Sequence, residues 1–285
     1  LHSLMRKHLL ADLSPKLLDK THNVILDFYH SKLKEIQLSH SHLNLQPILS
    51  EAYYHAQKRY PKTQLTTWLE RNDVKNVFTL LAKKGTAKFL LRLFQSITQS
   101  IPITSLDTEY LDIMIDMRHL AGDYIGATKT IETILSHYKP SEIEASQVLI
   151  RLSIRKIHHQ MFYQPVNPLL QEAFLLYDNN RHSNLSREIE FMIGGNLGVL
   201  SGEYTLCRKW LRKAIVSCKS SQDKPLLSRV IRKYAEIVKI AGHTTFAERI
   251  FKYGISLSKG FDRYELYLRC CLADLYVITR QLDLA

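Results

Sequence analysis

Seven basic side chains in the second half of the sequence have the types and the spacing to bind an acidic surface. They belong to two consecutive predicted helices: Arg208, Lys209, Arg212 and Lys213, then Arg229, Arg232 and Lys233. Residues three or four apart share a helix face, so we expect one patch on neighbouring helices. Guanidinium and ammonium groups bind carboxylates and phosphates through charge-assisted hydrogen bonds. The patch therefore predicts a protein partner with an acidic surface.

The charge distribution along the chain supports this hypothesis. The formal net charge is +12, and segment 205–263 carries 14 basic and 4 acidic side chains, whereas segment 101–204 carries 8 basic and 13 acidic ones. Two other interpretations stay open: a solvated face whose long side chains cover apolar surface, and binding to nucleic-acid phosphates, which is the less favoured. Another part of the same protein is a further acidic partner. Six tyrosines are candidates for lining a groove or for packing between helices: Tyr163, Tyr177, Tyr253, Tyr264, Tyr267 and Tyr276.

No other combination of residues indicates catalysis, a cofactor or a metal. The tightest histidine groups, His40-Ser41-His42 and His158-His159, lack cysteine or carboxylate partners at zinc-like spacing. The sequence contains neither a Gly-x-Ser-x-Gly elbow nor a Gly-x4-Gly-Lys-Ser/Thr phosphate loop. We therefore predict a non-enzymatic chain with no catalytic residue and no bound cofactor.

The remaining composition predicts a cytoplasmic protein. The four cysteines, Cys207, Cys218, Cys270 and Cys271, have no disulfide-framework spacing, and we expect reduced thiols. No apolar run approaches the roughly 18 residues that a membrane span needs. The first residues also lack the apolar core of a signal peptide.

The elements that carry these side chains are predicted to be helices throughout. No segment shows sustained alternation of β-branched and aromatic residues with polar ones, which excludes a sheet. Ser14-Pro15 is typical of a helix start, and residues 37–47, ending in Pro47, are expected to form a loop. Further helices are expected at about 47–60, 63–71, 73–84 and 87–98.

From about residue 103 a turn motif recurs. It is clearest as Gly122-Asp123-Tyr124 and Gly202-Glu203-Tyr204, and weaker at Gly242. With Gly85, Gln160 and Arg280 as further anchors, the spacing is 37 to 42 residues. Glycine suits a turn that needs positive φ after a helix. The period indicates repeated helix–turn–helix units, each of which must stack on its neighbours to bury its apolar face.

This pattern resembles the tetratricopeptide repeat, over about residues 103–285. It departs from the usual unit of about 34 residues by its length, and at Gln160-Met161-Phe162 by the missing glycine. The resemblance implies an all-α fold: a helical arm or linker bundle over 1–102, then a right-handed superhelix of tetratricopeptide-like repeats over 103–285 that continues beyond the C-terminus. Such superhelices bind proteins.

Three further segments resemble the STAND signal-transduction NTPases. They are Leu1-His2-Ser3-Leu4-Met5-Arg6-Lys7-His8-Leu9-Leu10, then His22-Asn23-Val24-Ile25-Leu26-Asp27-Phe28-Tyr29, then Glu51-Ala52-Tyr53-Tyr54-His55-Ala56. This resemblance implies a non-catalytic sensor that recognises a trigger protein or ligand and relays it to an upstream NTPase module. That module would oligomerise and drive immune defence or transcriptional control. The alternative is a stand-alone tetratricopeptide adaptor that assembles protein complexes.

Overall fold

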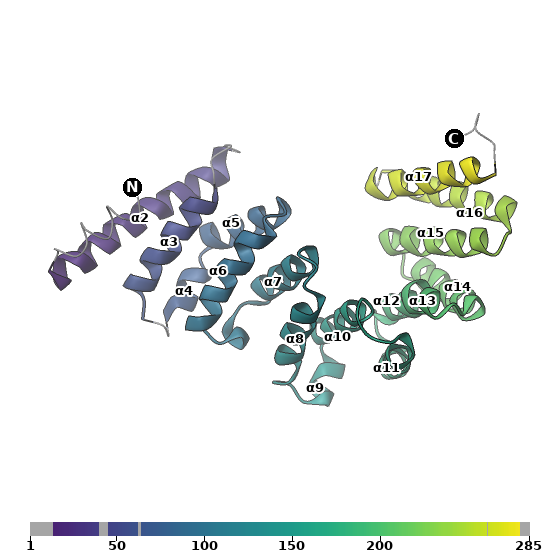
Figure 1. Cartoon of the computed structure of the whole chain (residues 1–285), viewed down its shortest axis with the longest axis horizontal. Coiled ribbons are helices and arrows are strands. Elements are labelled where there is room, and N and C mark those ends of the chain that lie inside the picture. The colour runs from purple at the N-terminus through teal and green to yellow at the C-terminus, as the bar shows by residue number, and fades with distance from the viewer. Residues whose placement is uncertain (1–13, 40–44, 62–63, 261, 280–285) are drawn as a thin grey trace. The chain divides into compact units, whose positions relative to one another are not determined.

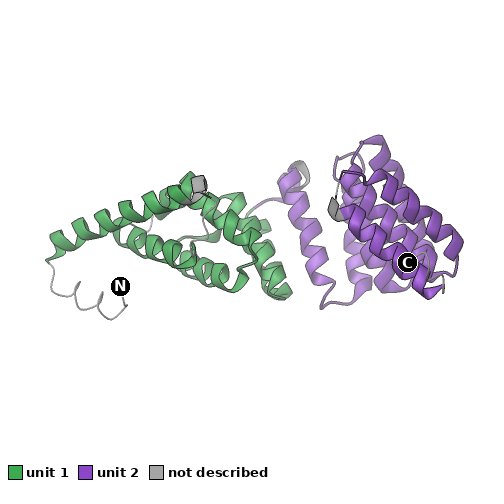
Figure 2. Cartoon of the chain, turned by 90° about the horizontal axis from the view of Figure 1, so that it is seen from above, with its two compact units in different colours: residues 1–137 green, residues 138–285 purple. Residues whose placement is uncertain are grey.

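The computed structural model describes residues 14–39, 45–61, 64–260 and 262–279. Throughout these ranges the regular structure is helical and contains no strand, which confirms the all-α prediction (Figure 1). The segment 1–10 used for the NTPase resemblance lies outside them. The chain divides into two compact units, 1–137 and 138–285 (Figure 2). The predicted division into 1–102 and 103–285 stays a prediction.

Unit 1 is a set of helices packed on their neighbours in the chain. They are α2 (Pro15–Ser39), α3 (Leu45–Arg59), α4 (Leu65–Leu69), α5 (Asn72–Lys83), α6 (Ala87–Ser100), η2 (Ile103–Ser105), α7 (Thr108–Leu120) and α8 (Tyr124–Leu135). The predicted helix start at Pro15 is confirmed. The predicted loop up to Pro47 is too long, because α3 already begins at Leu45. Pro47 lies in its first turn, where a proline removes no intrahelical hydrogen bond.

The core of unit 1 joins α2 to α3, α4 and α5 through buried polar contacts as well as apolar ones. The indole Nε1–H of the fully buried Trp68 donates to His30 Nε2 at 2.9 Å. The Nδ1 atoms of His22 and His55, both buried, lie 2.7 Å apart. Tyr110 donates its hydroxyl to the carbonyl of Leu69 at 2.6 Å. Buried polar groups with partners specify one packing arrangement.

Unit 2 consists of consecutive helical pairs. Its elements are α9 (Pro140–Ala145), α10 (Gln147–Gln160), α11 (Val166–Asn179), α12 (Ser186–Phe191), η3 (Met192–Leu197), α13 (Gly198–Ser201), α14 (Tyr204–Ser220), α15 (Lys224–Ile240), α16 (Thr244–Leu257) and α17 (Asp262–Ile278). The elements α12, η3 and α13 form one uninterrupted helix that packs on α14. Helix α15 contacts α14, α16 and α17, and their apolar faces form a continuous core.

The turns between paired helices follow one design. Gly122, Gly202 and Gly242 have φ of +75°, +74° and +84°, which confirms the role predicted for the turn glycines. After Gly242, the amide of His243 donates to the carbonyl of Val238 at 3.1 Å, which closes the helix end with a left-handed cap. The same turn occurs without glycine at Gln222, whose φ is +57°.

The helix 186–201 contains a π-helical segment, η3, that shifts its packing by one position. Two of its glycines closely approach α14: a Cβ on Gly194 would lie 2.9 Å from both Leu211 N and Trp210 Cβ, and a Cβ on Gly198 would lie 2.9 Å from Cys207 Sγ. A Cβ on Gly195, between them, would meet the ring of Phe191 in the same helix. A π turn holds one more residue than an α turn, so residues before it move round the helix axis.

Candidate partner-binding surface

Helix α14 carries four of the seven predicted binding residues on the sides left free by its packing. It buries one residue every three or four positions: Cys207, Leu211, Ala214 and Cys218. The residues between these positions must lie outward. Arg208 is half-buried and Lys209 is exposed. Within the part of the chain that the structure describes, neither has a hydrogen-bond or ion-pair partner.

The two other basic residues of α14 point to different neighbours. Arg212 Nε donates to the hydroxyl of Tyr234 on α15 at 2.9 Å. Lys213 lies over two aromatic rings on the other side, with its Nζ 4.2 Å from the ring centre of Tyr177 and 5.0 Å from that of Trp210. Consecutive helical residues are about 100° apart, so adjacent charges diverge. The structure therefore does not bring these two residues together.

Helix α15 carries the other three predicted residues, and two of them pair with one carboxylate. Arg232 forms an ion pair with Glu236, and Lys233 Nζ lies 3.0 Å from the other oxygen of the same carboxylate. Arg229 is exposed, and its guanidinium carbon lies 5.0 Å from the ring centre of Phe191. No described carboxylate pairs with Arg229. It is thus the arginine of α15 whose charge is left for an external acid.

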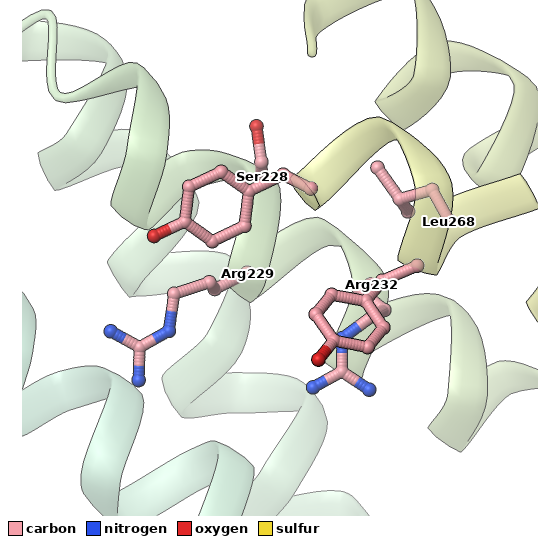
Figure 3. Close-up of a pocket in the computed structure, with 6 residues that line it drawn as sticks. Ser228, Arg229, Arg232 and Leu268 are labelled. Atoms are coloured by element: carbon pink, nitrogen blue, oxygen red, sulfur yellow. The ribbon is translucent and has the colours of Figure 1, made fainter. Parts of the chain in front are cut away.

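Two of the predicted arginines line a pocket between α15 and α17. The pocket has a volume of about 330 Å³ and is lined by Ser228, Arg229, Arg232, Tyr264, Tyr267 and Leu268. Figure 3 shows both guanidinium groups directed to the same side of the pocket. The hydroxyl of the buried Ser228 is held by Ser258 Oγ at 2.8 Å. The floor of the pocket is consequently fixed by packing between the repeats.

The chemistry of this pocket suits an acidic side chain with an apolar or aromatic neighbour. Two guanidinium groups favour a carboxylate, and arginine binds it with paired hydrogen bonds. Tyr264 and Tyr267 add flat surface with polar edges, which is typical of interface anchors. Both were candidates from the sequence, whereas Ser228 and Leu268 were not. A serine and a leucine do not by themselves indicate a binding site, and only the packing of α17 on α15 places Ser228 and Leu268 in this pocket.

The structure also contains a buried carboxylate that sequence reasoning missed. Glu190 is 1% exposed, and within the described ranges its Oε2 has no hydrogen-bond partner. Burial raises the pKa of this carboxyl group, and hydrogen bonds from Ser217 and Tyr177 and the charge of Lys213 oppose the rise. The only signal in the sequence was one acidic residue between two apolar ones, Ile189 and Phe191.

Three of the four cysteines of unit 2 have little nucleophilic character. Burial raises the pKa of Cys207 and, with the nearby Asp223 carboxylate, raises that of Cys218 to about 12. Burial and Glu236 likewise raise the pKa of Cys271. Because the thiolate is the reactive form, these three thiols are poorly suited to covalent catalysis at neutral pH. Of the histidines considered for metal binding, His158 and His159 lie on α10, and His40 and His42 lie outside the described residues.

The fold and this surface define a class: an all-α protein of stacked helical pairs, with a basic and aromatic pocket between helices α15 and α17. Within the described residues, every helix is too short or too polar to span a bilayer. No protein-family model matches the sequence, and no curated protein matches it. A crystal structure of a Rap protein complexed with competence and sporulation factor is similar to this chain in fold. The TM-score is 0.58 and the sequences are 11% identical, with 98% of this chain and 80% of that chain covered.

Proposed function

We propose that unit 2 binds a protein partner through an acidic segment that enters the pocket between α15 and α17. The observation that carries the proposal is the convergence of Arg229 and Arg232 with Tyr264 and Tyr267 in one pocket. The unpaired charge of Arg229 supplies attraction, and the tyrosines supply contact area at small entropic cost. The Rap structure, which holds a bound factor, supports a binding role for this kind of fold.

Labelled peptides test this binding directly. We expect a glutamate-rich peptide to bind the whole chain, and a lysine-rich peptide of the same length not to bind. Arg229→Glu and Arg232→Glu should each weaken binding about tenfold or more, as loss of a charge-assisted contact predicts. Lys209→Glu is the matched control, because this exposed lysine lies outside the pocket. If Lys209→Glu lowers the affinity for the peptide equally, the peptide is attracted by the general surface charge and does not bind in the pocket.

Nucleic acid is the competing occupant of the same charges. If duplex DNA binds more tightly than the glutamate-rich peptide, and its affinity depends steeply on salt concentration, then the partner is a nucleic acid and not an acidic protein.

In its finer form, the proposal is that this chain is the sensor region of a cytoplasmic STAND-type NTPase. Recognition of a trigger protein or ligand would be relayed to an NTPase module that precedes Leu1 and oligomerises. The sequence segments His22–Tyr29 and Glu51–Ala56 support it, and both lie in described helices. A Gly-x4-Gly-Lys-Ser/Thr loop encoded upstream, and ATP hydrolysis that rises when the partner binds, are the expected results. An unchanged rate of ATP hydrolysis on addition of the partner would contradict this signalling role.

The alternative function is a stand-alone adaptor that assembles other proteins. The similarity to the Rap structure favours it, because that similarity covers 98% of this chain and so includes the residues assigned to the NTPase arm. A reading frame that begins near Leu1 and encodes no phosphate-binding loop would support the adaptor over the NTPase sensor.

A further inference from the structure

A second pocket, in unit 1, has a different composition from the one in unit 2. It lies where α6, η2, α7 and the turn after α7 meet, and its volume is about 430 Å³. Four apolar side chains form much of its wall: Leu91, Phe94, Ile103 and Met114. Its polar end holds Arg118 and Asp123. An apolar body with a few fixed polar groups is the usual make-up of a small-molecule site, and this volume lies within the usual range of about 300–1,000 Å³.

The guanidinium group of Arg118 is held in place by three features. Its Nη1 forms an ion pair with Asp123 Oδ2. The other oxygen of Asp123 accepts the amide N–H of Gly126 at 2.9 Å and so caps α8. A side chain at position 126 would displace this ion pair, because its Cβ would overlap both Arg118 Nη1 and Asp123 Oδ2. A binding group that is fixed before the ligand arrives loses little entropy on binding.

One donor of this fixed group has no acceptor. The Nε atom of Arg118 is shielded from solvent and has no hydrogen-bond partner among the residues that the structure describes. A buried donor without an acceptor is unfavourable, and more so when it is charged. Because solvent does not reach this nitrogen, a ligand in the pocket does not reach it either, and the ligand must contact the exposed part of Arg118, whose side chain is 32% exposed.

The charged side chains that line the pocket favour an anionic ligand. Arg92 and Arg118 are its two cations, and Asp123 is its only carboxylate among the described residues. Arg92 is exposed and has no ion-pair partner among these residues. Asp123 is already engaged by Arg118 and by the Gly126 amide. The lining thus keeps one uncompensated positive charge beside an apolar wall.

We infer that this pocket binds a small organic acid with an apolar body. The carboxylate pairs with the guanidinium groups of Arg92 and Arg118, and the apolar body lies against Leu91, Phe94 and Met114. The inference does not depend on the proposed function, since all of its residues belong to unit 1.

Calorimetric titration of the whole chain with 4-phenylbutyrate and with 4-phenylbutanol tests the inference. The two probes share the aryl body and differ in the carboxylate, so we expect saturable binding of the acid and about tenfold weaker binding of the alcohol. Equal affinities, or no saturable binding of the acid, would overturn the inference.

Three variants locate the site. Leu91→Trp fills the pocket from a partly exposed position, and Arg118→Gln removes the charged donor. Each should weaken binding of the acid about tenfold. Lys129→Gln, at an exposed position of α8 outside the pocket, removes one charge from the same unit and should leave the affinity unchanged. Helix content by circular dichroism and the midpoint of thermal unfolding report whether each variant folds. If the correctly folded Leu91→Trp chain binds as the native one does, the ligand lies elsewhere and the inference fails.

Discussion

Lowering the pH should destabilise unit 1 through the buried His30. This side chain is 6% exposed, and its Nε2 accepts the indole N–H of Trp68, which requires a neutral ring. Burial, aided by the charge of Arg71, lowers the pKa of His30 from 6.5 to about 4, while Asp73 acts in the opposite direction. The folded chain therefore resists taking up a proton that the unfolded chain accepts below about pH 6.5.

The magnitude follows from the two pKa values. Above the unfolded value of 6.5 the ring is neutral in both states and contributes no pH dependence. Between about pH 7.5 and about pH 5 the unfolded state gains a proton and the folded state does not, which costs about 2 kcal/mol of unfolding free energy. The loss would reach about 3 kcal/mol as the pH approaches the folded pKa near 4.

Urea unfolding at the two pH values measures this effect. The chain has two tryptophans, so Trp210→Phe leaves Trp68 as the only tryptophan and as a reporter within unit 1. We expect His30→Gln, which keeps an acceptor for the indole but cannot be protonated, to lose about 2 kcal/mol less than the parent chain on acidification. His137→Gln, at an exposed position, is the control. The same loss in His30→Gln and in the parent chain would refute the assignment.

Two further predictions concern unit 2. Gly194→Ala should lower the unfolding free energy by about 1–3 kcal/mol, because the new methyl group would press on the backbone of α14 at Leu211 N; a stability gain in thermal unfolding, as helix propensity alone predicts, would contradict the packing. A thiol reagent at neutral pH should modify the exposed Cys270 rapidly and Cys218 only on unfolding, because burial raises the pKa of Cys218 to about 12. Loss of the fast phase in Cys270→Ser checks this assignment.

The helices themselves were predictable, because their signals are local. Ser14-Pro15 at the start of α2 and the glycines at 122, 202 and 242 act through the backbone angles of a few residues. Two local features still escaped prediction. Pro47 was taken as a loop residue although the first turn of a helix accepts proline. The turn at Gln222 repeats the left-handed cap without a glycine to mark it.

The candidate site was predictable in its chemistry but not in its geometry. The sequence predicts Arg229 and Arg232 as neighbours on one helix face, and in the structure both line the pocket. The same rule grouped Arg212 with Lys213, and these two residues contact Tyr234 and Tyr177 on different helices. Spacing along a helix gives the direction of a side chain about its own axis but not the helix that lies opposite.

The sequence by itself determined the all-α class, the repeat period and the turns, because periodic burial and backbone preference act over a few residues. Only the tertiary structure decided which polar groups meet. It brought Tyr264 beside Arg229, buried Glu190 between helices, and left the Arg118 Nε–H without an acceptor. These relations join residues from different helices. They depend on packing distances, which leave no pattern in the order of the amino acids.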